Sequence, residues 1–389
     1  MKVLILAKQI PYPLADGYNL RIFNYVRNLY RRHLFYLITY GNDYIPEELK
    51  QYFEDIKVVK RNPICKEPFN IRKIYKSFSL GGIFRFNQEI LDNLKTVIKQ
   101  NELDVIWICG WEMFIYAPYH NNLPILGDVI DDPFLSYLRE LLRPQDIKSF
   151  LYLLKRTFNI LRFEKRYFKR ADRCVVVSET DARVLKRVCS NLPVITIHNG
   201  VDTEYFKPMG YIEENPSLIF EGSMDYGPNE DAVIYFCERI FPLIKAEVPE
   251  TKFIIVGKNP TPKVKALERP DDIIVTGFVQ DIRPYLEKAS IFVCPMRMGA
   301  GIKNKILQAW AMSKPVVATP KSCGGLKAKE NENIIIVSKP KEFANAVIDL
   351  LRNSSERKRI GQSGTEIVNK YYTWVAKSKE LEDILLELA

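Results

Sequence analysis

One segment places three basic residues beside two glycines in its first half, and it carries the strongest chemical signal in the chain: PMRMGAGIKNKILQAWAMSKPVVAT at 295–319. An apolar strand is expected to end at Cys294, and a helix is expected to follow the glycines. The N-terminus of a helix presents free N–H groups to an anion, and glycine lets the backbone approach a ligand closely. The alternative is a chance glycine-rich loop beside solvated lysines. We expect a pyrophosphate site made by Arg297, Gly299, Gly301, Lys303 and Lys305.

Two further loops place glycine after an apolar run. Asp16 and Gly17 precede a helix expected from about Asn19, and Gly222 lies in FEGSMDYGPNEDA at 220–232. Ligands of parallel α/β sheets bind beyond the carboxyl ends of the strands, where such loops lie. Each loop could equally be an ordinary turn. No GxGxxG motif occurs, so a nicotinamide dinucleotide site is not supported.

Acid and base candidates are few. Asp128, Asp131 and Asp132 follow the run PILG, and one of them could orient or deprotonate a hydroxyl group. A loop of solvated aspartates, or an aspartate that caps a helix, explains the same pattern. His120 in YAPYHNN is a second candidate on the same half of the chain, whereas His198 and His33 read as structural positions.

The elements that would position these residues alternate between short apolar runs and longer segments of helical period. This alternation predicts strands and helices in parallel, doubly wound sheets covered on both faces. Pro208, Gly210 and Pro216 interrupt the pattern between the halves, and 371–389 has the apolar spacing of a final helix. The expected strands of the two halves are 3–7, 35–39, 104–108, 124–128, 174–178 and 194–198, then 217–222, 252–257, 272–277, 290–295, 314–319 and 333–338.

Composition narrows the class of protein. The chain has 389 residues, 47% of them hydrophobic and 27% charged, which predicts two folded domains rather than disorder. No apolar run approaches the ~20 residues of a membrane-spanning helix, and the N-terminus does not read as a signal peptide. Seven widely spaced cysteines predict neither a disulfide framework nor a zinc site. A cytoplasmic location is expected.

The net charge of +10 is concentrated in one segment, 135–173, which holds eleven basic and four acidic residues. Leu, Phe, Tyr and Ile alternate with Lys and Arg there at helical spacing. Such a stretch can lie on an anionic membrane, with Phe150, Leu153, Leu154 and Phe158 toward the lipid, or it can be a solvated helix. The basic residues expected to face the headgroups are Lys155, Arg156, Arg162 and Lys165. Nucleic acid is a weaker reading, since no binding motif is present.

Four segments read in order resemble the retaining glycosyltransferases of family 4: EKRYFKRADRCVVVSETD, ITIHNGVDTEYFKP, FEGSMDYGPNEDA and GIKNKILQAWAMSKPVVAT. The third and fourth particularly resemble the branch associated with exopolysaccharide synthesis. The resemblance implies the GT-B fold, with two facing Rossmann-like domains. It implies an acceptor domain at 1–207, a nucleotide-sugar domain at 208–370 and a last helix, 371–389, that crosses back to the first domain.

The resemblance also assigns roles. Gly17 matches the family's glycine near the donor phosphates, with Arg21 on the following helix, and Gly222 and Ser223 match its donor loop. The usual Arg and Lys of that loop are absent, which shifts phosphate neutralisation to Lys303 and Lys305, with Ile302 beside them in the expected donor site. Gln308 and Ala300 replace the two acids of the family's E-x7-E motif. Glutamine cannot offer two charged oxygens to a ribose.

Together these readings predict a retaining, metal-independent hexosyltransferase with no cofactor. It would move a sugar from a nucleotide diphosphate to a glycan or lipid-linked acceptor, in surface polysaccharide synthesis, at or near the inner face of the membrane. A sugar-nucleotide epimerase of the same shape and a non-catalytic scaffold are the alternatives. The epimerase would turn over the donor without an acceptor.

Overall fold

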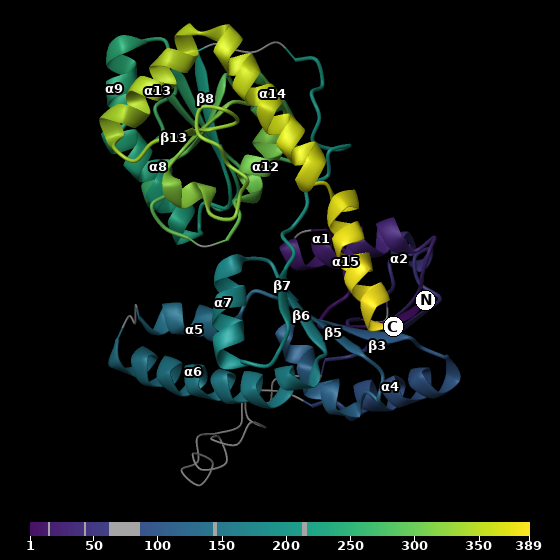
Figure 1. Cartoon of the computed structure of the whole chain (residues 1–389). Coiled ribbons are helices and arrows are strands. Elements are labelled where there is room, and N and C mark those ends of the chain that lie inside the picture. Colours follow the sequence, from purple (N-terminus) through teal and green to yellow (C-terminus); the bar gives the residue numbers. More distant parts are fainter. Residues whose placement is uncertain (15, 43, 62–85, 143–145, 212–215, 300) are drawn as a thin grey trace. The chain divides into compact units, whose positions relative to one another are not determined.

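The computed structural model describes residues 1–389 except 15, 43, 62–85, 143–145, 212–215 and 300. It divides into two compact units, which are described separately. The first contains Met1–His198 and Lys377–Ala389, and the second contains Asn199–Ala376. Each unit is built on a parallel sheet covered by helices (Figure 1), so the prediction of two Rossmann-like, doubly wound domains is confirmed.

The first unit has a seven-stranded sheet of order β3-β2-β1-β4-β5-β6-β7. Central β1 pairs in parallel with β2 and with β4, so that Ile5 lies between Leu37 and Trp107. The strands are β1 (Lys2–Ala7), β2 (Leu34–Tyr40), β3 (Asp55–Val59), β4 (Val105–Cys109), β5 (Ile125–Ile130), β6 (Arg173–Val176) and β7 (Val194–Thr196). The helices are α1 (Gly17–Leu29), α2 (Glu47–Lys50), α4 (Gln88–Gln100), η2 (Trp111–Tyr119), α5 (Pro133–Leu141), α6 (Ile147–Tyr167), η3 (Phe168–Arg170) and α7 (Glu179–Val188).

The second unit has a six-stranded parallel sheet of order β10-β9-β8-β11-β12-β13. Its strands are β8 (Ser217–Glu221), β9 (Lys252–Val256), β10 (Ile273–Gly277), β11 (Ile291–Cys294), β12 (Val316–Ala318) and β13 (Ile335–Ile336). Its helices are α8 (Gly227–Arg239), α9 (Phe241–Glu247), α10 (Pro262–Lys265), α11 (Arg283–Lys288), α12 (Asn304–Ala311), η4 (Pro320–Cys323), α13 (Pro340–Arg352) and α14 (Ser354–Tyr371).

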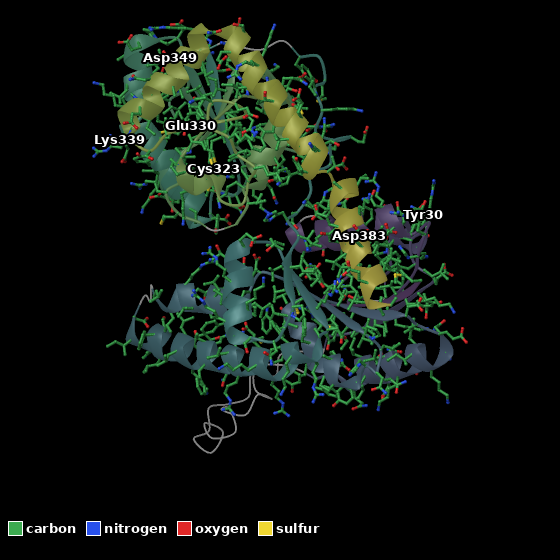
Figure 2. The ribbon with its side chains drawn as sticks, viewed as in Figure 1. Tyr30, Cys323, Glu330, Lys339, Asp349 and Asp383 are labelled. Carbon is green, nitrogen blue, oxygen red and sulfur yellow. The ribbon has the colours of Figure 1, made fainter. Side chains whose placement is uncertain are left out.

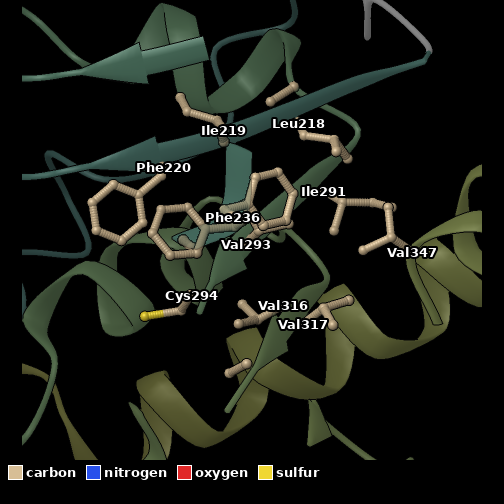
Figure 3. Close-up of a cluster of buried hydrophobic side chains, with 14 of the residues drawn as sticks. Leu218, Ile219, Phe220, Phe236, Ile291, Val293, Cys294, Val316, Val317 and Val347 are labelled. Carbon is tan, nitrogen blue, oxygen red and sulfur yellow. The ribbon is translucent and has the colours of Figure 1, made fainter. Parts of the chain in front are cut away.

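The core of the second unit forms where the faces of the central strands meet the covering helices. Figure 3 shows Phe220 of β8, Val293 of β11 and Val316 of β12 in one cluster with Phe236 of α8 and Val347 of α13. All five side chains are fully buried. Because these strands are apolar on both faces, helices must cover both sides of the sheet.

Every expected strand overlaps an observed one, but the analysis missed β3. Asp55–Val59 reads DIKVV, which alternates polar and apolar residues and lies at the edge of the sheet. An edge strand needs only a partly apolar face, so its pattern is weaker than that of the central strands.

The boundaries between the units differ from the expected 207 and 371. Val201 donates its N–H to the carbonyl of Tyr372 at 2.7 Å and forms a bridge with Thr373. Gly200 packs so closely on Trp374 that an added Cβ would lie 2.8 Å from its ring. The NGVD residues, 199–202, therefore contact the segment 372–374, and both segments belong to the second unit.

The last helix, α15 (Trp374–Leu388), begins among residues of the second unit, and its later turns pack in the first. Leu381, Ile384 and Leu385 are buried, whereas Asp383, labelled in Figure 2, is exposed. Glu382 is buried too, and its carboxylate lies 2.6 Å from Nε2 of His33 and 2.8 Å from Arg32. This buried polar contact fixes how the helix docks on the first unit.

No helix in the described ranges is both long enough and apolar enough to cross a lipid bilayer.

Replacing Glu382 with Ala should lower the free energy of unfolding of the first unit by about 1–3 kcal/mol, because buried His33 loses its partner. Thermal or urea unfolding followed by circular dichroism measures the effect. Glu387→Ala is the matched control on the same helix, since Glu387 is mostly exposed and pairs with Arg173 near the surface. Equal stabilities of the two variants would contradict the assignment.

Candidate functional site

The strand order of the second unit brings two of the glycine loops together. The order reverses between β8 and β11, which are neighbours although α8, α9, β9, α10, β10 and α11 separate them in sequence. Parallel strands on either side of such a reversal send their following loops in opposite directions, which opens a crevice at their carboxyl ends. Gly222 follows β8, and the segment from Pro295 to Lys303 follows β11. The geometry therefore places a ligand crevice at these loops.

Glycine is required at the floor of this crevice. Gly222 has φ +151° and Gly257, after β9, has φ +154°. A Cβ at Gly257 would lie 1.7 Å from the carbonyl oxygen of Gly222, so the two backbones touch. A Cβ at Gly222 would lie 2.5 Å from Nδ2 of Asn229 and 2.8 Å from Nζ of Lys305. Both glycines keep the space above the sheet edge open.

Lys305 is held in a defined position. Its Nζ donates to the carbonyl oxygen of Glu221 at 2.5 Å and to Oδ1 of Asn229 at 2.9 Å, and it lies 4.0 Å from the centre of the Phe220 ring. Burial lowers the pKa of Lys305, and burial raises the pKa of the Glu221 carboxyl, against the effect of Lys305. An anion bound beside this ammonium group would favour its charged form.

Asn229 organises the other side of the crevice. Its Nδ2 donates to the carbonyl oxygen of Ser223 at 2.9 Å, while its Oδ1 accepts from Lys305. The side chain is buried, and it joins the loop after β8 to the helix after β11. The sequence analysis did not select Asn229, although it lies within the quoted segment 220–232.

The loop before α12 completes the crevice. Gly299 has φ +104° and Gly301 has φ +68°, in the left-handed region that glycine adopts without strain. Lys303 precedes the first residue of α12, is buried, and donates from Nζ to the carbonyl oxygen of Gly301 at 2.9 Å. The N–H of Ile306 bonds the carbonyl oxygen of Lys303 at 2.9 Å, so the N–H groups that helix geometry leaves for a ligand are those before Ile306.

These elements enclose a pocket of about 320 Å³. Of the expected donor residues, Ile302, Lys303, Lys305 and Gln308 line it, and Gly222 lies beside Lys305. Ala300 lies outside the described residues. The remaining lining residues, which the sequence analysis missed, are Glu221, Tyr226, Asn229, Met296 and Asn304. Apart from their place in the quoted loops, nothing in their types distinguished them.

Two expected members of the donor set point elsewhere. Arg297 makes a two-pronged ion pair with Asp231 of α8, at 3.0 and 2.5 Å, and stacks over Tyr235 at 4.3 Å. It does not line the pocket, so the structure gives no support to its expected role at the phosphates. The hydroxyl of Ser223 donates to Oδ1 of Asp225, and Ser223 does not line the pocket.

In the first unit, Arg21 and Asp128 pair with each other. Arg21 Nε donates to Asp128 Oδ2 at 2.8 Å, and its Nη1 donates to the carbonyl oxygen of Ile197 at 2.9 Å. Neither side chain is exposed to solvent. Burial raises the pKa of Asp128 even beside this cation. The structure therefore gives no support to the roles expected for Arg21 in donor binding and for Asp128 in catalysis, because the two groups pair with each other in the core.

Three candidates of the first unit remain accessible or partly so. Gly17 is the exposed first residue of α1, which Asp16 caps by accepting from the N–H of Asn19 at 2.8 Å. Asp131 is exposed just after β5. His120 is half-buried, and its Nδ1 lies 2.9 Å from the carbonyl oxygen of Leu123, so it closes a turn.

Asp132, next to Asp131, is a helix cap with a buried acidic neighbour. Its Oδ1 accepts from the N–H of Leu135 at 2.7 Å, and Oε1 of Glu164 on α6 accepts from the N–H of Phe134 at 2.9 Å. Both carboxyl groups are fully buried. Burial raises the pKa of Asp132 to about 7 and that of Glu164 to about 9, and each carboxyl adds to the local negative charge. Among the described residues, Asp132 Oδ2 and Glu164 Oε2 have no hydrogen-bond partner.

This pair makes stability depend on pH. Both folded-state pKa values lie above the ordinary values of 3.8 and 4.5, so between about pH 4 and pH 9 the folded protein holds more protons than the unfolded chain. The contribution is present at low pH and is lost as the pH rises through about 7 and then about 9. Glu164→Gln cannot ionise and should raise the stability at pH 8 by about 1–3 kcal/mol.

Chemical unfolding of the Glu164→Gln variant at pH 5 and pH 8 measures this, with Glu140→Gln on the exposed side of α5 as the matched control. We expect a smaller loss of stability between the two pH values in Glu164→Gln than in the wild type. If the free energy of unfolding of Glu164→Gln falls between pH 5 and pH 8 by as much as that of the wild type, Glu164 ionises normally.

Two family models and several known sequences match this chain. Residues 15–205 match the model described as Glycosyltransferase Family 4, and residues 215–353 match the model described as Glycosyl transferases group 1. An uncharacterized glycosyltransferase of Methanocaldococcus jannaschii, MJ1178, is 23% identical over 96% of this chain and 95% of its own. An uncharacterized 44.6 kDa protein in the cps region of Klebsiella pneumoniae is 25% identical, over 41% of this chain and 43% of that protein.

Solved structures share the fold over the full chain. Anabaena HepE in complex with UDP matches with a TM-score of 0.66 at 14% identity, covering 100% of both chains. The sucrose-phosphate synthase of Thermosynechococcus elongatus matches with a TM-score of 0.70 at 16% identity, covering 100% of this chain and 99% of that one. At these identities the likeness establishes the fold.

Proposed function

We propose that this chain, a GT-B protein whose two halves match glycosyltransferase family models, transfers a sugar from a nucleotide diphosphate to a glycan or lipid-linked acceptor with retention at the anomeric carbon. The observation that carries the proposal is the pocket of the second unit, where Lys303, Lys305 and the start of α12 meet at the reversal of strand order. A diphosphate fits this set of donors in charge and in hydrogen-bonding capacity.

The pocket residues would divide the work. Lys303, Lys305 and the amides of α12 would hold the diphosphate and stabilise the charge that develops on it as the sugar leaves. Asn229 would keep Lys305 in place through its hydrogen bond of 2.9 Å. Gln308 would reach the ribose as acceptor and donor, in place of a carboxylate.

Retention by front-face attack, with the leaving diphosphate receiving the acceptor proton, is the mechanism we favour. Asp128 is paired with Arg21 in the core, and Nδ1 of His120 is engaged with a carbonyl oxygen. Of the three catalytic candidates, Asp131 is the one that is exposed as a residue, although partial burial of its carboxyl group and the nearby Asp181 raise the pKa of that group. It would act, if at all, by orienting the acceptor.

The relatives support a biological setting for this proposal. HepE was solved with UDP and with UDP-glucose, so uridine donors are the first to test. The Klebsiella relative comes from a cps region, which supports a role in cell-surface polysaccharide synthesis on the cytoplasmic side of the membrane. A thermal-shift screen of UDP-, GDP-, ADP- and dTDP-sugars would identify the donor, because a bound ligand raises the unfolding midpoint.

Lys303→Ala should weaken binding of UDP by about 1.5–3 kcal/mol, since a charge-assisted contact to phosphate is lost. Isothermal titration calorimetry measures the affinity. Arg297→Ala is the matched control: it removes a cation from the same loop, but one that pairs with Asp231 outside the pocket. Equal losses in both variants, or none in Lys303→Ala, would sink the assignment of the pocket.

Turnover should continue in EDTA, because the lysines and the helix N-terminus neutralise the phosphates without a divalent cation. Turnover is measured as the release of the nucleoside diphosphate in the presence of acceptor. Loss of turnover that magnesium or manganese restores would contradict metal independence.

A non-catalytic role is the second candidate, and Gln308 is the observation that favours it, because the pocket lacks a carboxylate at that position. A scaffold would bind the nucleotide without consuming the donor. An epimerase would convert the donor with no acceptor present. Donor consumption measured with and without acceptor separates these from the transferase.

A further inference from the structure

Helix α6 exposes a row of large apolar side chains along its length. Ile147 is 79% exposed, Leu151 59%, Leu154 46% and Phe158 50%. Their spacing of four, three and four residues places them on one face of the helix. The opposite face packs into the first unit through Ile160 and Phe163, among others. A solvent-facing apolar row of three turns marks an interaction surface.

Basic residues lie beside this row within α6, and the exposed Asp146 caps the start of the helix. Lys148, Lys155 and Arg162 recur every seven residues, which puts them along one flank of the apolar row. Lys165 and Arg166 follow at the end of the helix and are exposed. The one acidic residue within α6 is Glu164, which is buried and turned toward α5. The exposed side of α6 is therefore apolar and basic.

Two residues expected on this surface, Leu153 and Arg156, are not part of the exposed row or its basic flank. Leu153 is half-buried. Arg156 donates from Nε to the hydroxyl of Tyr137 on α5 at 2.7 Å and from Nη1 to that of Tyr152 at 2.9 Å. The row begins earlier than expected, at Ile147, and includes Leu151.

We infer that this face of α6 docks the protein on an anionic lipid surface, with Ile147, Leu151, Leu154 and Phe158 at the acyl boundary and the basic flank on the headgroups. An amphipathic helix with this division lies in the plane of the membrane interface. A second copy of the chain is a poorer occupant, because it would bring a second basic flank against the first. Nucleic acid is poorer as well, since three of the four side chains in the row that would face it are aliphatic and cannot stack on bases.

The inference sharpens the choice of acceptor toward the lipid-linked class, and in that respect it builds on the proposed function. The docking itself depends only on the surface of α6. Lipid binding is measured without turnover, and UDP binding is measured without lipid, so failure of either one leaves the other result standing.

Co-sedimentation of the full chain with vesicles tests the inference. We expect pelleting with phosphatidylcholine vesicles that contain phosphatidylglycerol, little pelleting with phosphatidylcholine alone, and loss of binding when salt is raised from about 0.1 M to about 1 M. Lys148→Gln, Lys155→Gln and Arg162→Gln combined should lower the partition coefficient about a hundredfold, at about 1 kcal/mol for each basic residue. Leu151→Ser with Phe158→Ser should lower it at least about tenfold.

Matched controls change the same chemistry elsewhere. Lys95→Gln, Lys99→Gln and Lys186→Gln remove the same charge from exposed positions on α4 and α7, and Leu243→Ser removes an exposed leucine from α9. These variants should bind like the wild type, and circular dichroism should show every variant folded. Equal pelleting with neutral and anionic vesicles, no pelleting with either, or equal losses in the control variants would overturn the inference.

Discussion

The reversal of strand order between β8 and β11 is the constraint on which the proposed donor site depends. It brings the loop after Glu221 and the loop after Cys294 to one edge of the sheet, although the two loops are far apart in sequence. Lys305 spans them by donating to the carbonyl oxygen of Glu221. Asn229 adds the second link. Because Gly257 has no side chain, its backbone can contact the carbonyl oxygen of Gly222. This contact lets the loop after β8 lie against the end of β9.

Pairing among charged groups decides which of them can meet a ligand. Arg21 and Asp128 neutralise each other inside the first unit, and Arg297 is held by Asp231 on the surface of the second. A buried ion pair with additional hydrogen bonds resists disruption, because removing one partner strands the other charge away from water. Lys303 and Lys305 each donate to a backbone carbonyl oxygen, of Gly301 and Glu221 respectively. A neutral carbonyl oxygen orients an ammonium group without cancelling its charge, which suits this geometry to an anionic ligand.

The α5–α6 pair is built with opposite chemistry on its two sides. Inside, Asp132 and Glu164 cap the first turn of α5 and hold protons that exposed carboxyl groups would release. Outside, α6 exposes aliphatic and aromatic side chains beside lysine and arginine. Because Asp132 and Glu164 are buried, they form no ion pairs with the described basic residues on the outer face of α6. The helix pair can therefore pack on the first unit and still present a basic, apolar surface.

Much of the fold was determined by the sequence alone, since a strand buried on both faces needs a short run of apolar residues, and every such run overlaps a strand. The glycine-rich, basic loop before α12 could also be predicted from the sequence, because its glycines and lysines are close together in the chain. Only the tertiary structure decided the partners of the charged residues. Arg21 and Asp128 are 107 residues apart, and Arg297 and Asp231 are 66 apart. Local patterns record which side chains must be buried, whereas the pairing of distant charges depends on how the sheets order their strands.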